Sequence, residues 1–339
     1  MAKRLGRYAF QFEKGIYVAG YGNVVGQKEG QGPLGGCFDQ IEPDLYCGKK
    51  TMEQAEVYLQ QTALKIALNR AGLEREELDL AAAGDLLNQC VSSAYGFRES
   101  NVPYLGLYGA CSTMALSSLV AALSIEAGLS RNAAAMTSSH FGTAERQYRF
   151  PLEYGGQRTP SAQHTVTASG AVIWSSKPHP VQLVGGAFGS IQDKGVSDLN
   201  NMGGAMAPAA LKLILDYLRE TQTKPSDYDM MLTGDLGSIG AEIVAELAQN
   251  GGVDLHSVYR DCGVMMYDRQ KQDMHAGGSG CGCSAAILTG YVIPKLWRGE
   301  LKNVLFLSTG ALMSPTVSMQ GETIPGIAHL LHLKGGMVC

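Results

Sequence analysis

The chain has 339 residues, a formal net charge of −4 at pH 7 and 45% hydrophobic residues, which is enough apolar material for a full core without disulfide staples. Its lysines and arginines are scattered, so no basic stripe favours nucleic acid as a partner. No stretch approaches the roughly 18 uncharged apolar residues of a membrane span, and no apolar signal core follows the basic start. Any membrane association is therefore expected to be peripheral or through a partner.

The first part of the chain alternates strand and helix patterns. Residues 15–22 predict a strand that runs into a glycine turn. A helix is predicted from Thr51, with Gln54 three residues later in a capping-box pattern, to a stop at Gly72. Residues 78–86 form a continuous run of small apolar residues, which is typical of a buried parallel strand.

Cys111 lies at an abrupt change from an apolar run to a helix of small residues, predicted from Cys111 to Ile125. This helix contains no charged residue, so we expect it to be buried on nearly every side. Its N-terminal amides and the positive end of its dipole favour a thiolate or a bound anion at Cys111. The pattern fits a nucleophile or an anion site, and also a small apolar residue in a packing layer.

The second part of the chain repeats features of the first. The predicted strands over residues 78–86 and 228–236 both end in Gly-Asp-Leu. Glycine-rich segments open a helix in each part, at residues 109–112 and 280–286, and a strand follows each helix, over residues 132–138 and 303–308. Another helix is predicted over residues 209–218, and residues 193–205 are predicted to be a loop over the cleft.

This repetition predicts an α/β fold made of two βα halves related by a pseudo-two-fold axis. The pattern is interrupted at residues 175–180, which divides the chain into halves 1–179 and 180–339. Such an arrangement brings the two glycine-rich helix starts to one central cleft, and ligands of such sheets bind beyond the carboxyl ends of the strands.

The eight cysteines are spread thinly through the chain, so reduced thiols are expected. Cys281-Gly282-Cys283 lies near His275, but the segment lacks the paired spacing of a structural zinc site. No metal and no cofactor is therefore expected.

The duplicated pattern with Cys111 at the first helix start resembles the thiolase superfamily, especially condensing enzymes of the ketoacyl synthase III type. The resemblance covers nearly the whole chain and implies a thiolase-like duplicated βα fold, with layers of helices around two mixed sheets. These enzymes complete a Cys-His-Asn set. Here the histidine position falls at residues 233–235 and the asparagine position near Gly282, and neither residue is present. Because the loss of even one oxyanion donor costs about 10²–10³ in rate, the family's chemistry is not expected.

Four segments carry a more specific resemblance, to the stage V sporulation protein AD family; they cover residues 108–113, 137–140, 151–157 and 275–283. This resemblance implies a non-catalytic protein that binds pyridine-2,6-dicarboxylate (dipicolinate), or its calcium chelate, during uptake into the developing spore. It also implies membrane proteins of the same SpoVA group as partners, and a peripheral location at the cytoplasmic face of the spore inner membrane. A homodimer is a further expectation, because thiolase-like folds usually form one.

A flat aromatic dianion needs donors at both carboxylates and a narrow apolar slot for the ring. The amides after Cys111 supply one anion cradle, and residues directly after the predicted strand 132–138 should meet the cleft. Positive charge is expected from Arg158, with Arg146 and Arg149 as alternatives in the same insert. The expected ligand-binding residues are Cys111, Ser112, Ser139, His140, Arg158 and Gly282.

Two other functions remain open from the sequence. In the first, the chain is an acyltransferase or condensing enzyme with Cys111 as nucleophile and His140 or His275 in place of the missing histidine. In the second, the pocket is vestigial and the protein is a scaffold that holds membrane partners together.

Overall fold

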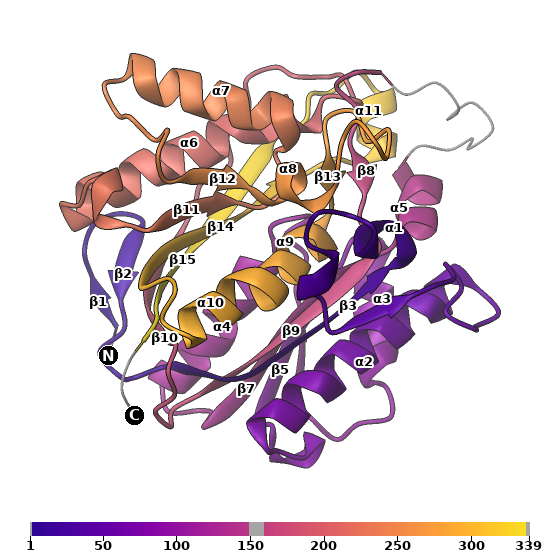
Figure 1. Ribbon diagram of the computed structural model, residues 1–339, viewed down its shortest axis with the longest axis vertical. Coiled ribbons are helices and arrows are strands. Elements are labelled where there is room, and N and C mark those ends of the chain that lie inside the picture. The colour runs from indigo at the N-terminus through magenta and orange to yellow at the C-terminus, as the bar shows by residue number, and fades with distance from the viewer. Residues whose placement is uncertain (1, 149–158, 337–339) are drawn as a thin grey trace.

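Two groups of strands lie on either side of a central layer of helices in the computed structural model, which describes residues 2–148 and 159–336 (Figure 1). α4 (Thr113–Glu126) and α9 (Cys281–Ile287) belong to this central layer. α2 (Met52–Ala71) packs on the outer face of one strand group, and α6 (Met202–Thr221) on the outer face of the other. The layers therefore run helix, sheet, helix, sheet, helix.

The two strand groups have the same order and the same strand directions. The first runs β3 (Tyr17–Gly26), β9 (Ala168–Ser175), β7 (Asn132–Ser139), β5 (Leu80–Asp85) and β6 (Tyr104–Gly106). The second runs β10 (Gln182–Phe188), β15 (Gly326–Lys334), β14 (Asn303–Ala311), β11 (Met230–Thr233) and β12 (Tyr259–Asp261). In each group the last three strands are parallel and the second is antiparallel to both neighbours.

The groups meet at their β3 and β10 edges through one antiparallel residue pair, Tyr17 with Gln182, so strand pairing continues from one into the other. The predicted α/β fold class with layered helices and mixed sheets is confirmed, with the two expected sheets joined at this edge. The predicted boundary between residues 179 and 180 falls between β9 and β10, and it stays a prediction.

The other described elements are mostly short. α7 (Gly237–Asn250) packs beside α6 on the outer face. The remaining strands are β1 (Lys3–Arg4), β2 (Ala9–Gln11), β4 (Gln40–Glu42), β8 (His164–Thr165) and β13 (Gly278–Ser279). The remaining helices are α1 (Gln27–Gly30), α3 (Val91–Phe97), α5 (Phe141–Tyr148), α8 (Cys262–Met266), α10 (Ile293–Trp297) and α11 (Pro315–Met319). A π-helical turn, Leu288–Val292, joins α9 to α10, and single 3₁₀ turns lie at Gly35–Cys37, Arg75–Glu77, Asn88–Cys90 and Pro225–Asp227.

The predicted limits of α2 are confirmed by its caps. The Thr51 side chain accepts a hydrogen bond from the backbone N–H of Gln54 at 3.3 Å, and Gly72 ends the helix with φ 63°. The predicted loop over residues 193–205 is wrong at its end, because α6 already begins at Met202, capped by the side chain of Asn201.

The apolar faces of α4 are covered by strands of this same chain, from both strand groups. Its uncharged run before Glu126 therefore reflects a position in the middle layer and gives no support to a homodimer, which stays a prediction. Among the described helices, none is long and apolar enough to cross a bilayer.

Candidate functional site

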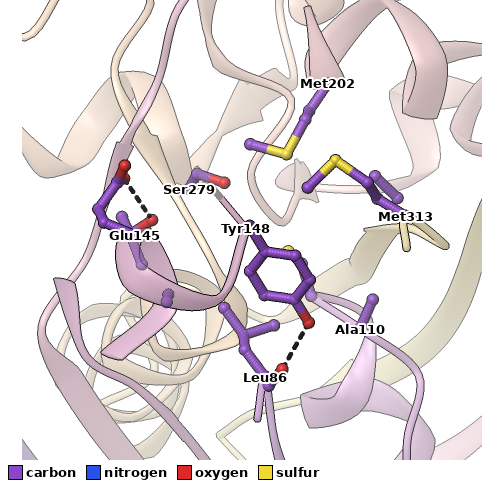
Figure 2. A pocket seen from close by; sticks show the side chains of 11 residues that line it. Leu86, Ala110, Glu145, Tyr148, Met202, Ser279 and Met313 are labelled. Atoms are coloured by element: carbon purple, nitrogen blue, oxygen red, sulfur yellow. Dashed lines mark hydrogen bonds between the residues drawn. The ribbon is translucent and has the colours of Figure 1, made fainter. Parts of the chain in front are cut away.

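A pocket opens where the starts of α4 and α9 meet, at the carboxyl ends of the parallel strands (Figure 2). The cavity itself is small, about 30 Å³, and the unfilled space reaches about 420 Å³ only when its open mouth is included. Cys111 lies in its wall, and the other lining side chains come from both halves of the chain: Leu86, Ala144, Glu145, Tyr148, Thr165, Met202, Ser279, Ala311 and Met313. The predicted meeting of two helix starts at one cleft is thus present, with Cys111 in its lining.

A tight turn presents Cys111 to this pocket. Ala110 has φ 49°, in the left-handed region that side chains rarely adopt, and the N–H of Ser112 bonds to the carbonyl of Gly109 at 3.0 Å. Gly310 in β14 leaves the space that the turn needs, because a Cβ there would lie 2.6 Å from the carbonyl oxygen of Gly109. Cys111 is therefore held by close backbone contact between the two halves.

The thiol of Cys111 is protonated in this setting. Burial raises its pKa well above the ordinary value, and the negative charge of Asp235 raises it further. The thiol and the Asp235 carboxyl interact as hydrogen-bond donor and acceptor. The thiolate expected from the dipole of α4 is therefore wrong, because burial and a neighbouring carboxyl oppose it.

Asp235 follows β11 and lies behind the pocket lining, in contact with Ser279 and Cys111. It is fully buried, and its oxygens accept hydrogen bonds from the Gly280 N–H at 2.8 Å and from the Thr309 hydroxyl at 2.8 Å. The Ser279 hydroxyl points to the same carboxyl at 3.4 Å. Burial raises the pKa of Asp235 to about 6, against these donors.

Asp235 is the functional candidate that sequence reasoning missed. It belongs to residues 233–235, the segment that the resemblance aligned with the family histidine. The sequence analysis noted only that the histidine is missing there. The signal was available, since Gly234-Asp235-Leu236 repeats the Gly84-Asp85-Leu86 end of β5. In this segment the structure places a buried acid beside the cysteine.

Ser139 and Gly282, both proposed as ligand-binding, are used in packing between the halves. The Gly282 N–H donates to the Ser139 hydroxyl at 3.1 Å, and that hydroxyl donates to the Val166 carbonyl at 2.6 Å. The Ser112 hydroxyl likewise donates to the carbonyl of Gly109 at 2.6 Å. These three residues hold the walls of the pocket, and their polar groups have partners inside the chain.

His140 lies outside the pocket lining and is bonded in the core. Its Nδ1 accepts from the Gly142 N–H at 3.1 Å, so Nε2 carries the proton and donates to the Leu45 carbonyl at 2.7 Å. Burial lowers the pKa of His140 and keeps it neutral. His275 contacts the carbonyl of Thr159 and the carboxyl of Asp273. The structure brings neither imidazole to Cys111.

The expected positive charge is not found in the described wall of the pocket. Arg146 pairs with Glu53 on the surface, and Arg149 and Arg158 lie outside the described residues. The described lining contains no lysine, arginine or histidine, and its one carboxylate is Glu145, which accepts from Thr165 at 3.2 Å. The described lining therefore supplies no cationic side chain.

A second cavity, of about 510 Å³ including its mouth, lies on the other side of β8. Gln27, Lys28, Phe141, His164 and Thr167 are among its lining residues. The Lys28 ammonium lies 5.8 Å from the centre of the Phe141 ring, on which His164 stacks at 4.3 Å. This cavity has the cation that the described Cys111 pocket lacks, but no thiol lines it.

Other buried thiols also lie near carboxyls, as Cys90 does near Asp85. The seven described cysteines are free, and five of them, Cys111 and Cys281 included, are buried. Within residues 2–148 and 159–336, no group of three or more His, Cys, Asp or Glu side chains is placed to hold a metal ion.

Comparison with known proteins gives one family and one fold. The family model "Stage V sporulation protein AD" matches residues 6–334. The stage V sporulation protein AD of Bacillus subtilis (strain 168) is 41% identical over 327 residues, which cover 96% of each chain.

Solved structures of condensing enzymes and thiolases share the fold. The 3-oxoacyl-[acyl-carrier-protein] synthase III of Aquifex aeolicus VF5 matches 94% of this chain and 100% of its own with a TM-score of 0.59 and 13% identity. Human mitochondrial 3-ketoacyl-CoA thiolase matches 96% of this chain and 99% of its own with a TM-score of 0.61 and 12% identity. At such identities the likeness establishes the fold alone, and it confirms the predicted thiolase-like architecture.

Proposed function

The chain belongs to the stage V sporulation protein AD family, and from that membership we propose that it is a non-catalytic binding protein for dipicolinate. In this proposal it takes part in the uptake of dipicolinate, free or as its calcium chelate, into the developing spore. It acts at the cytoplasmic face of the spore inner membrane, bound peripherally to membrane proteins of the same sporulation system. The family's sporulation name supports the setting, and the pocket supports binding without chemistry.

One observation carries the non-catalytic part of the proposal: the Cys111 thiol is buried next to a carboxyl. A cysteine nucleophile needs a lowered pKa or a neighbouring base that takes its proton, and its usual partner is an imidazole. At Cys111 both burial and the Asp235 charge raise the thiol pKa. A thiol in this state lines a binding site better than it attacks a thioester.

The walls of the pocket support a flat aromatic ligand. Leu86, Met202 and Met313 give apolar surface, and the two methionine side chains are adaptable (Figure 2). The Tyr148 ring lies between Leu86 and the two methionines, and its hydroxyl donates to the Leu86 carbonyl at 2.5 Å. Small-molecule sites typically combine such apolar walls with a few polar groups, which here include Cys111 and Ser279, with Thr165 and Glu145 beside them.

Calorimetric titration of dipicolinate into the purified protein tests this proposal. We expect saturable binding to the wild-type chain, and a loss of at least about tenfold in affinity for Cys111→Trp, whose indole fills the pocket. Cys37→Trp is the matched control, because Cys37 is exposed and free. Absence of binding by the wild-type protein, or undiminished binding by Cys111→Trp, contradicts the proposal.

The second candidate function is acyl transfer through Cys111, favoured by the position of this thiol at the start of α4 in a fold shared with synthases. Incubation with acetyl-CoA followed by peptide mass spectrometry separates the two functions. Binding without chemistry predicts unmodified Cys111, whereas an acetyl adduct on Cys111 supports the transferase.

A further inference from the structure

The buried carboxyl of Asp235, next to Ser279 of the Cys111 pocket, raises a question about the proposed ligand. Dipicolinate is a dianion near neutral pH, because ordinary carboxyl groups titrate near pH 4. The described pocket wall offers it Glu145 and no cationic side chain, and Asp235 lies directly behind the wall. An ionised Asp235 repels a dianion placed there, so the charge of Asp235 must matter for binding.

Two of the polar groups in the pocket lining, the Cys111 thiol and the Ser279 hydroxyl, direct their hydrogens toward Asp235. The Cys111 thiol donates to its carboxyl, and the Ser279 hydroxyl does so at the long distance of 3.4 Å. While Asp235 is ionised, these hydrogens are held by its negative charge. A protonated Asp235 no longer holds them, and both groups can then donate to a carboxylate in the pocket.

We propose that Asp235 is a positioning residue that couples dicarboxylate binding to the uptake of one proton. The inference rests on the proposed function. The proton comes from solvent and is bound by the Asp235 carboxyl, to which the Thr309 hydroxyl donates a hydrogen bond at 2.8 Å. The thiol and the Ser279 hydroxyl then turn to the ligand. Loss of the ligand restores both hydrogen bonds to the ionised Asp235 and releases the proton.

The groups that surround Asp235 agree with a carboxyl that is readily protonated. Asp261, the last residue of β12, lies behind it, and the two carboxyls repel each other. The thiols of Cys262, Cys281 and Cys283 face it from α8 and α9, in addition to Cys111. With no ligand present, the pKa of Asp235 is already raised to about 6 by burial. A dianion a few ångströms away raises it by a further 1–3 units or so, so proton uptake is expected near neutral pH.

The test is isothermal titration of dipicolinate at pH 6.5 and pH 7.5, in pairs of buffers with different ionisation enthalpies, which gives the number of protons bound per ligand. We expect close to one proton bound, and affinity up to about tenfold weaker at the higher pH, since one pKa unit corresponds to a factor of ten. Pyridine-2,6-dicarboxamide, a neutral ligand of the same shape, should bind without proton uptake.

Two variants assign the proton. Asp235→Asn keeps the shape of the side chain, and we expect it to bind dipicolinate with no proton uptake and no pH dependence over this range. Glu56→Gln is the matched control, because Glu56 is a buried carboxyl with a raised pKa that does not line the pocket; it should take up protons as the wild type does. Should Asp235→Asn fail to fold, the wild-type proton count and the dicarboxamide still decide the question.

The outcomes are distinguishable. Binding of dipicolinate with no proton uptake overturns this inference and leaves the proposed function standing. Proton uptake that persists in folded Asp235→Asn overturns the assignment to Asp235. Absence of dipicolinate binding at both pH values overturns the proposed function, and the inference with it.

Discussion

At Cys111, the competition between burial and the helix dipole decides the state of the thiol. The dipole at a helix start contributes about 0.3–1 kcal/mol, and up to about 2 kcal/mol in partly buried geometries. Full burial shifts the pKa of an ionisable group by up to about 3–5 units, at about 1.4 kcal/mol per unit. Burial therefore wins, and Asp235 adds to it.

Alkylation should reveal this state. We expect iodoacetamide at pH 8 to label exposed Cys37 readily in the folded protein, and to label buried Cys111 at least tenfold more slowly until denaturant is added. Peptide mass spectrometry over a time course measures both rates in one sample. Labelling of Cys111 at the rate of Cys37 would show an exposed, reactive thiolate and refute this description of the site.

The buried carboxyls near the site give a pH dependence of stability with a definite sign. Burial raises the pKa of Asp261 to about 7 and that of Asp235 to about 6, from an ordinary value of 3.8. Between pH 3.8 and the raised pKa values, the folded state therefore binds more protons than the unfolded state. The stability that these two protonated carboxyls contribute is complete below about pH 4 and is lost as pH rises through 6 and 7.

Thermal denaturation of wild type and Asp261→Asn between pH 4.5 and 8 tests that sign. The variant loses hydrogen bonds at every pH, because Asp261 accepts from Thr233 at 2.7 Å and from the Leu236 N–H at 2.9 Å. Its Tm should nevertheless approach or overtake that of the wild type as pH rises, by several degrees over the range, at about 2–4 °C per kcal/mol. A difference that stays constant or widens with pH refutes the raised pKa.

At the scale of elements, the start of α9 explains why residue 282 is glycine. A Cβ on Gly282 would lie 2.5 Å from the Ala168 carbonyl oxygen and 2.6 Å from the Ser139 hydroxyl. The helix start and β9 therefore approach as closely as backbones allow, which brings α9 against the first half of the chain. A close contact of this kind accounts for the absence of an asparagine side chain at this point.

Substitution at Gly282 measures the importance of that contact. Gly282→Ala should cost about 1–3 kcal/mol of stability, as overpacking usually does, with a matching fall in the denaturation midpoint. Gly36→Ala is the control, since nothing lies within 4 Å of a Cβ at Gly36, and we expect almost no change there. An equal effect of the two changes would contradict the close packing of α9.

The ends of a helix could be predicted where the local sequence determines them. The caps of α2 at Thr51 and Gly72 follow from residue types that favour those conformations. The start of α6 at Met202 was missed because Gly203 and Gly204 suggested a loop. Both glycines are tightly packed: a Cβ on Gly203 would lie 2.2 Å from the Leu236 carbonyl oxygen. Packing of a helix against its neighbour is tertiary information that a local pattern does not contain.

At the scale of the whole molecule, the site exists because two similar halves share a central helix layer. The repeated Gly-Asp-Leu strand ends and the two glycine-rich helix starts predicted this arrangement, and the matching strand orders agree with it. The individual site residues were less predictable. Ser139 is the last residue of β7 and His140 follows it. Their polar groups bond to the Val166 and Leu45 carbonyls, because the end of a strand determines where a residue lies but not which neighbour accepts its hydrogen bond.

The acid beside Cys111 could not be foreseen for a related reason. Asp235 and Cys111 are 124 positions apart in the chain and meet only through the packing of the two halves. The resemblance drew attention to residues 233–235, but only because the family histidine is missing there. The chemistry of the pocket depends on what replaced that histidine, which the fold alone brings next to the thiol.

A crystal structure of the protein with dipicolinate tests the central claim most directly. The account predicts the pyridine ring against Tyr148 and the two methionines of the Cys111 pocket, with a carboxylate within hydrogen-bond distance of Cys111 or Ser279 and the thiol unmodified. Dipicolinate in the cavity of Lys28 and Phe141, with the Cys111 pocket empty, would contradict it.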